Sequence, residues 1–87
     1  GYDTTGHAMT WTWHLLAEHP DVQRRLHAEL DAVLGGRLPT EADLARLPYA
    51  ARVVQEALRL YPPIWSFARA SVAEDTLCGR RIPAGAV

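Results

Sequence analysis

Residues 48–63 read PYAARVVQEALRLYPP, and this stretch decides how the rest of the chain is interpreted. A proline opens it at a position where a helix needs no backbone N–H, and Pro62-Pro63 close it. Between the prolines, polar side chains recur at helical spacing among Ala, Val and Leu: Arg52, Gln55, Glu56 and Arg59. The stretch therefore predicts a helix over about 48–61 with one polar stripe, on which Glu56 and Arg59 are close enough to form an ion pair.

Three further helices are expected before this one, at about 1–18, 20–34 and 40–46. The first has apolar residues around most of its circumference, which is typical of a helix buried on more than one side. The second begins with Pro20 and ends at Gly35-Gly36, which can take the left-handed conformation that ends a helix. The third begins with the capping-box pattern of Thr40 and Asp43.

After Pro63 the apolar period changes from helical to two. Residues 64–69 (IWSFAR) are expected to form a strand, and about 76–83 a hairpin with Gly79 in its turn. The predicted fold class is therefore mainly α with a small β part. Residues 1–87 are expected to form a single, incomplete domain, because the chain begins inside a helix and ends directly after a turn.

Composition excludes several classes of function. The net charge of −1 and the absence of a basic block argue against a nucleic-acid partner. No apolar run approaches the roughly 20 residues of a membrane-spanning helix. The single cysteine, Cys78, allows no internal disulfide, and we expect it to pack as a small hydrophobic residue. A lone cysteine fits a reducing compartment, so a cytoplasmic location is expected. The histidines do not have the spacing of a metal site.

The tripeptide Asp3-Thr4-Thr5 combines a carboxylate with two hydroxyl groups in the first turn of the first predicted helix. One interpretation is a cluster that caps the helix, since Thr hydroxyls in helices usually bond to a nearby carbonyl. The other is a proton relay, in which a carboxylate and a hydroxyl pass protons through water to a reacting group. The Glu56–Arg59 pair has a similar plain alternative, an exposed ion pair on a solvated face.

In combination, these features resemble the cytochrome P450 family, the haem-thiolate monooxygenases. Residues 1–5 are similar to the oxygen-binding motif on the family's long central helix, and residues 56–63 (EALRLYPP) to its Glu-x-x-Arg helix and the usual continuation. Arg69 and residues 79–85 are similar to the strand and hairpin that follow. The resemblance implies an internal segment of a larger enzyme, inactive alone. The alternative from another class is a small helical interaction module with no catalytic role.

The resemblance implies roles for individual residues. Asp3 and Thr4 would lie over the haem face where oxygen binds and deliver the two protons that splitting dioxygen requires. Gly1 matches a small residue that leaves room for oxygen beside the helix. Glu56 and Arg59 match a buried ion pair that stabilises the haem-side core. In the family, this pair also involves a further Arg, which is expected beyond this chain. An atypical member such as an isomerase often alters the Asp-Thr pair, which is intact in this sequence.

Arg69 matches a position that binds a haem propionate in many members, although a rim arginine is the alternative. Ile64, Trp65 and Phe67 match the substrate-facing segment, although Trp65 and Phe67 could equally be core aromatics. The iron's cysteine ligand is expected beyond the end of this chain, so Cys78 is not assigned that role, and no residue is assigned to a metal. The implied cofactor is haem; the implied partners are dioxygen, a small organic substrate and an electron donor, either a reductase or a ferredoxin.

Overall fold

The computed structural model describes all residues, 1–87, and is mainly helical. Its elements are α1 (Asp3–Glu18), α2 (Pro20–Leu34), a 3-10 helix (Glu41–Arg46), α3 (Pro48–Leu60), β1 (Asp75–Leu77) and β2 (Arg80–Ile82). The expected helices over 1–18, 20–34 and 48–61 are confirmed to within two residues at each end. The expected helix over 40–46 is confirmed in position, but it is a 3-10 helix rather than an α-helix.

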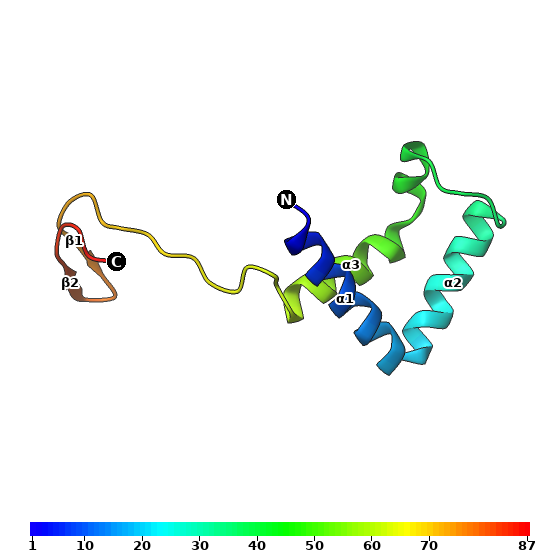
Figure 1. Cartoon of the computed structure of the whole chain (residues 1–87), viewed down its shortest axis with the longest axis horizontal. Helices are drawn as coiled ribbons and strands as arrows, with labels where there is room; N and C mark the ends of the chain where they lie inside the picture. The colour runs from blue at the N-terminus through cyan, green and yellow to red at the C-terminus, as the bar shows by residue number, and fades with distance from the viewer.

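The chain is elongated, with extents of 58 × 29 × 25 Å (Figure 1). The three α-helices and the 3-10 helix form one end, and the hairpin of β1 and β2 forms the other, with an extended segment between them. Helix α1 contacts both α3 and α2. The radius of gyration is 19.5 Å, whereas a compact chain of this length would have about 12 Å. Most apolar side chains are therefore not enclosed by this chain.

The helix ends follow from the residues placed there. Pro20 and Pro48 each stand in the first turn of a helix, where the missing N–H costs no hydrogen bond. Gly35 ends α2 in the left-handed conformation, with φ of 58°, and Gly36 follows with φ of 88°. Both halves of the predicted capping box are present at the 3-10 helix, between Thr40 and Asp43.

The strand expected over 64–69 is wrong. Residues 64–70 have no regular secondary structure, because no other part of this chain lies beside them to complete a ladder of hydrogen bonds. The expected hairpin is confirmed: β1 and β2 pair antiparallel, with Thr76 opposite Arg81. Its turn is Cys78-Gly79, with φ of 51° and 74°. Cys78 is exposed, so the expectation that it packs as a hydrophobic residue is also wrong.

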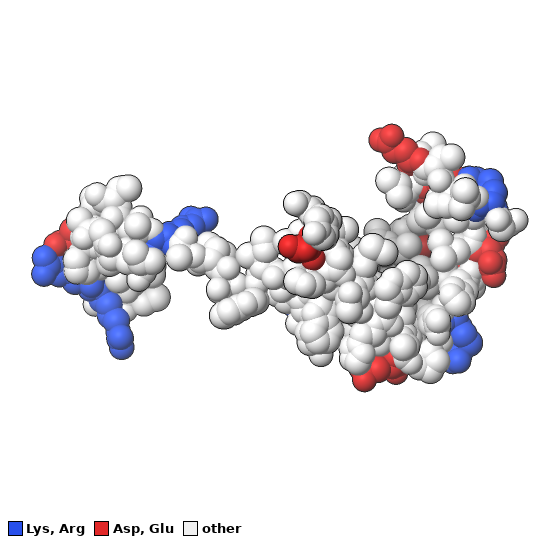
Figure 2. Space-filling model, viewed as in Figure 1, with Lys and Arg blue, Asp and Glu red and all other residues white.

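The enclosed core is small. Leu16, Leu47 and Ala57 are the only buried apolar residues, and Leu16 and Ala57 are 5% and 3% exposed. Figure 2 shows that charged side chains gather over the hairpin and over the far end of the helices, leaving the surface between them mainly uncharged on this face. No helix combines the length and the apolar character that crossing a bilayer would require.

Asp43 is the one buried charged residue, at 4% exposed, and it closes the loop between α2 and the 3-10 helix. Its carboxylate accepts two hydrogen bonds from the Arg37 guanidinium at 2.6 and 2.7 Å, and one from the Thr40 N–H at 2.8 Å. These hydrogen bonds hold the pKa of Asp43 far below its usual range, with the Arg37 contact as the largest cause. The charged carboxylate is therefore the form that stabilises this loop.

Because the pKa of Asp43 is lower when folded than when unfolded, its stabilising contribution is present above the unfolded pKa of about 4 and is lost as the pH falls towards the folded pKa. Asp43→Asn should lower the urea midpoint near neutral pH. The difference from wild type should shrink at about pH 3, where the wild type has begun to lose this contribution. The exposed Asp31→Asn is the control, and a pH-independent difference for Asp43→Asn would contradict the assignment.

Candidate functional site

A hollow of about 430 Å³ lies where the start of α1 meets the end of α3. Its lining comes from α1 through Thr4, Thr5 and Ala8, and from the end of α3 and the segment after it through Leu58, Pro62, Pro63 and Ile64. Two residues that the sequence singled out for different roles, Thr4 and Ile64, are therefore brought to one place. The hollow is shallow and open to solvent in this chain, and apart from the two threonines its lining is apolar.

The threonines of α1 fall into two groups. Thr10 and Thr12 donate hydrogen bonds from Oγ1 to the carbonyl oxygens of Gly6 and Ala8, at 2.8 and 2.7 Å. This is the ordinary use of a hydroxyl inside a helix. The hydroxyls of Thr4 and Thr5 have no hydrogen-bond partner in this chain, and both residues line the hollow. They remain available to bind water or a ligand.

Asp3 is the first residue of α1, where a carboxylate interacts favourably with the helix dipole. Its side chain is exposed and precedes Thr4 directly. Tyr2 occupies the cap position without a side-chain cap bond, so Asp3 is the acidic group of the first turn. Gly1 precedes α1, and it has no close neighbour at the position of a Cβ atom, as is true of every glycine in this chain.

Glu56 and Arg59 form the predicted ion pair. Arg59 donates from Nε and Nη2 to the two carboxylate oxygens of Glu56, both at 2.7 Å. The hydrogen bonds from Arg59 lower the pKa of Glu56, and Glu56 raises the pKa of Arg59 in turn. The side chains are 57% and 66% exposed, so the expectation of a buried pair is not met within these 87 residues. The reason is that no other part of this chain covers that face of α3.

The remaining residues assigned from the sequence do not gather at the hollow. Trp65 and Phe67 are exposed on the extended segment, and only Ile64 of the three substrate-facing candidates lines the hollow. Arg69 stacks over the Phe67 ring, with its Cζ 5.2 Å from the ring centroid, and takes part in no ion pair. Its guanidinium fork is therefore free for an external carboxylate.

One of these residues has the chemistry to hold the implied haem at a propionate. The guanidinium of Arg69 forms no ion pair and would suit a propionate, whereas Thr4 and Thr5 line the separate hollow. No group of three or more His, Cys, Asp or Glu side chains is arranged to hold a metal ion.

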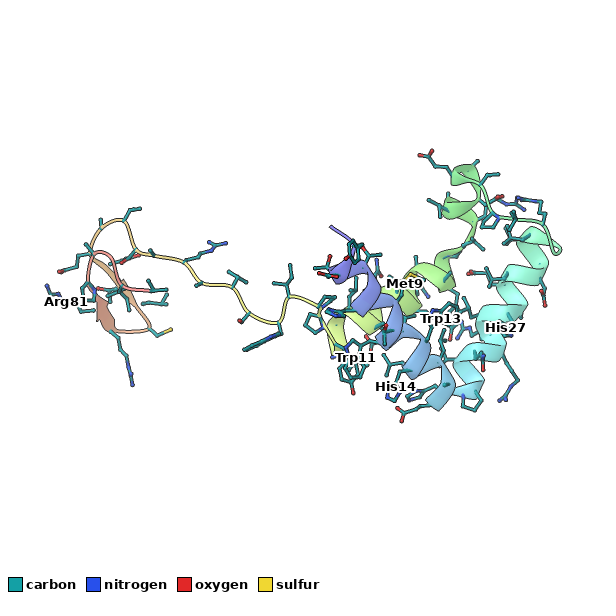
Figure 3. The ribbon with its side chains drawn as sticks, viewed as in Figure 1. Met9, Trp11, Trp13, His14, His27 and Arg81 are labelled. Carbon is teal, nitrogen blue, oxygen red and sulfur yellow. The ribbon has the colours of Figure 1, made fainter.

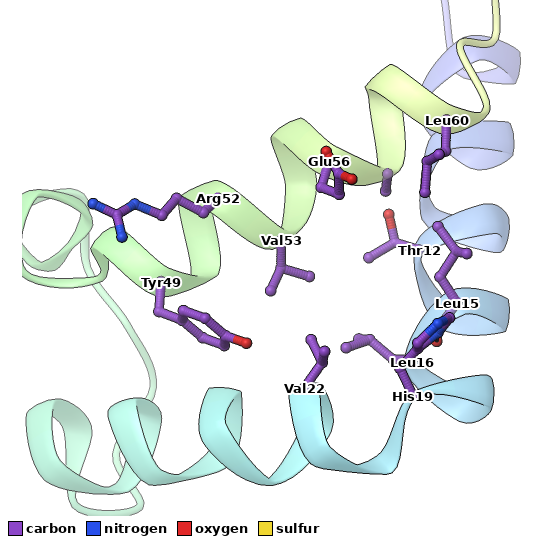
Figure 4. Close-up of a pocket in the computed structure, with 11 residues that line it drawn as sticks. Thr12, Leu15, Leu16, His19, Val22, Tyr49, Arg52, Val53, Glu56 and Leu60 are labelled. Carbon is purple, nitrogen blue, oxygen red and sulfur yellow. Dashed lines mark hydrogen bonds between the residues drawn. The ribbon is translucent and has the colours of Figure 1, made fainter.

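A second pocket, of about 360 Å³, lies between the three α-helices (Figure 4). Leu15 and Leu16 reach it from α1, Val22 from α2, and Val53 and Glu56 from α3. Periodicity predicted the apolar stripes of these helices, but it could not show that they enclose a space. Glu56 is among the residues that line this pocket, and its carboxylate also forms the ion pair with Arg59.

Glu29, which no sequence pattern indicated, links α2 to α3 by hydrogen bonds. Its two carboxylate oxygens accept hydrogen bonds from the backbone N–H groups of Tyr49 and Ala50, at 2.8 and 2.9 Å. Pro48 has no N–H, so these are the first free donors of α3. The partners are separated by 20 and 21 residues, so no local pattern signalled this cap.

Glu29→Ala should lower the free energy of unfolding by about 1 kcal/mol, because two N–H groups of α3 lose their acceptor. Glu29→Gln should cost less, since one oxygen remains to accept a hydrogen bond. Urea unfolding followed by circular dichroism measures both. Asp31→Ala, on the same helix but outside the cap, is the control; an equal loss for Asp31→Ala would refute the capping role.

The chain is similar to proteins of one family throughout its length. The family model described as Cytochrome P450 matches residues 1–87. Cyclooctatin synthase of Streptomyces melanosporofaciens is 52% identical over 83 residues, an alignment that covers 95% of this chain and 18% of that protein. Cyclooctat-9-en-7-ol 5-monooxygenase of the same organism is 48% identical over 85 residues, covering 98% of this chain and 18% of that protein.

Among solved structures, a zebrafish cytochrome P450 determined with progesterone superposes with a TM-score of 0.80 and 30% identity. The superposition covers 99% of this chain and 21% of that chain. It confirms the predicted fold class, mainly α with a small β hairpin. The chain spans about a fifth of the length of each of these proteins.

Proposed function

Since the chain belongs to the cytochrome P450 family, we propose that it forms the oxygen-facing helix and the Glu-x-x-Arg helix of a haem-dependent monooxygenase. The observation that carries the proposal is the hollow at which Thr4 of α1 meets Ile64 after α3. A threonine hydroxyl beside an apolar lining supports a site where water and an organic molecule lie next to each other. The family's cofactor is haem, and we propose that its iron is held by a cysteine thiolate outside these 87 residues.

The proposed reaction consumes one organic substrate RH, one dioxygen, two electrons and two protons, and yields ROH and one water. The electrons come from a separate or fused reductase or a ferredoxin. Haem, when bound, supplies the activation of dioxygen, and the surrounding protein supplies the binding pocket and the protons. Arg69 would hold the cofactor at its edge through a propionate, and Gly1 would leave room beside the helix.

The proposed role of this chain in the reaction is to deliver protons. A threonine hydroxyl can donate one hydrogen bond and accept two, so Thr4 can hold one water molecule in the hollow. Asp3, one residue earlier and exposed, can exchange protons with solvent and pass them to that water. The apolar lining from Leu58, Pro62 and Ile64 offers no hydrogen bonds to further water, whose entry would waste reducing power.

For the substrate, we propose a small, mainly hydrocarbon molecule with few polar groups. The apolar lining of the hollow supports this class. A relative that is 48% identical is named for its action on cyclooctat-9-en-7-ol, which is a molecule of this kind.

The test is to supply oxygen-18 gas, an electron donor and cyclooctat-9-en-7-ol to the full-length enzyme that contains this segment. Mass spectrometry should find one labelled oxygen atom in the product and the other in water. A product whose added oxygen comes from solvent, or a haem-loaded enzyme that consumes no oxygen, would contradict the proposed function.

A further inference from the structure

Trp11 and Tyr61 form the closest aromatic contact in the structure. Their ring centroids are 4.1 Å apart and their planes differ by 6°, so the rings are stacked face to face. Trp11 comes from the middle of α1, and Tyr61 is the residue that ends α3. Figure 3 shows Trp11 on a different side of α1 from Met9 and Trp13. The stack therefore joins the two helices whose ends frame the hollow at Thr4.

Trp11 shares a helix face with the residues of α1 that line the hollow. Thr4, Ala8 and Trp11 are four and then three residues apart, a spacing that places side chains on one side of a helix. On the other helix, Leu58 lines the hollow and stands three residues before Tyr61. The stack therefore lies next to the contact between α1 and α3 that borders the hollow.

Tyr61 also leads directly into three residues that line the α3 side of the hollow, Pro62, Pro63 and Ile64. Its N–H donates to the Ala57 carbonyl oxygen at 2.9 Å, and Pro62 and Pro63 follow it directly. A proline fixes its own φ and restricts the residue before it, so few backbone rotations remain between Tyr61 and Ile64. A ring contact that holds Tyr61 in place therefore narrows the range of positions open to Ile64.

We infer that the Trp11–Tyr61 stack is a positioning contact that sets the Pro62–Ile64 wall beside Thr4 and so determines which carbon of a bound substrate is oxygenated. The inference rests on the function proposed above. Neither ring lines the hollow, so the pair acts through Ile64 and not by touching the substrate.

The test uses the full-length enzyme with cyclooctat-9-en-7-ol as substrate and Trp11→Ala, Trp11→Phe and Tyr61→Ala as variants. Loss of the stack in either alanine variant should lower the ratio of major to minor oxygenated product about two- to tenfold. Trp11→Phe keeps a ring that can stack and should restore most of the ratio. Trp11→Ala and Tyr61→Ala together should be no worse than one alone, because each removes the same contact.

A second readout does not depend on turnover. 4-Fluorophenylalanine placed at position 67, just beyond the wall, should give one sharp fluorine resonance in the wild type. It should give a broadened or split one in Trp11→Ala and a sharp one again in Trp11→Phe. The matched control is Tyr49→Leu, which removes an aromatic contact with Arg25 at the other end of α3. It should change neither readout.

The outcomes separate the two proposals. If the wild type forms no product but the fluorine spectra change as expected, the proposed substrate class fails and the positioning role stands. If product forms and both the product ratio and the fluorine spectrum of Trp11→Ala equal those of wild type, the positioning role is refuted. The positioning role is also refuted if Trp11→Phe fails to recover, or if Tyr49→Leu shifts the product ratio as much.

Discussion

In the full-length enzyme, Thr4→Ala is expected to divert most of the electrons from product to hydrogen peroxide. The Thr4 hydroxyl is the group proposed to hold the water that passes protons to the reacting oxygen, and positioned proton transfer is commonly worth a factor of about 100 or more. The yield of product per NADPH should fall about tenfold or further, while haem content and oxygen consumption stay close to wild type. Peroxide and product are both measured against the NADPH consumed.

Thr10→Ala is the control for this substitution. It removes the same atoms from the same helix, but the Thr10 hydroxyl is already bonded to the Gly6 carbonyl oxygen at 2.8 Å and does not line the hollow. Thr10→Ala should therefore form about as much product per NADPH consumed as the wild type. Equal peroxide release from the two variants would mean that helix α1, and not the Thr4 hydroxyl, is responsible.

The second large effect is expected from Glu56→Gln, which should leave the enzyme largely without haem. The carboxylate holds Arg59 through two hydrogen bonds at 2.7 Å and also lines the pocket between the three helices. In a full-length enzyme we expect further polypeptide to cover this face of α3, so the loss of the charge would leave the Arg59 guanidinium enclosed without its partner. The ratio of haem absorbance to protein absorbance after purification measures the effect.

Glu74→Gln is a closely matched control. Glu74 also pairs with an arginine, Arg81, and its side chain is 57% exposed in this structure, the same fraction as Glu56. Because the two glutamates are equally exposed in this structure, an effect that depended on exposure alone would leave Glu56→Gln and Glu74→Gln with equal haem content. A haem-loaded Glu56→Gln enzyme that resembles Glu74→Gln would contradict the structural role of the Glu56–Arg59 pair.

Local rules predicted the parts of the fold that depend on nearby residues. Pro20, Gly35, the Thr40–Asp43 capping box and Gly79 in the hairpin turn each act within a few residues, and the structure has all of them where the sequence placed them. The turn also includes Cys78, which the sequence pattern had not placed there. The Glu56–Arg59 contact belongs to the same group, because residues three apart on a helix meet whatever surrounds them.

The errors concern features that need a distant partner. Residues 64–69 alternate as a strand does, but a strand forms only beside another segment, and this chain provides none there. Burial of the Glu56–Arg59 pair likewise depends on what covers α3. The Glu29 cap and the Trp11–Tyr61 stack could not be predicted for the same reason, since each joins residues that only the folded chain brings together.

For the candidate site, the sequence suggested individual residues but not their arrangement. Thr4 and Ile64 were assigned separate roles, and the structure brings both to one hollow. Trp65, Phe67 and Arg69 remain on the extended segment, away from it. Their assignments as substrate-facing and propionate-binding residues stay predictions.

The proton-handling role of the Thr4 hydroxyl is tested most directly by comparing Thr4→Val with Thr4→Ser in the full-length enzyme, as product formed per NADPH consumed. Valine keeps the branched shape of threonine and lacks the hydroxyl, whereas serine keeps the hydroxyl and loses the methyl group. Thr4→Ser should remain mostly coupled, and Thr4→Val should release most of its electrons as peroxide. A valine variant as well coupled as wild type, or a serine variant as uncoupled as valine, would contradict the proton-handling role of the Thr4 hydroxyl.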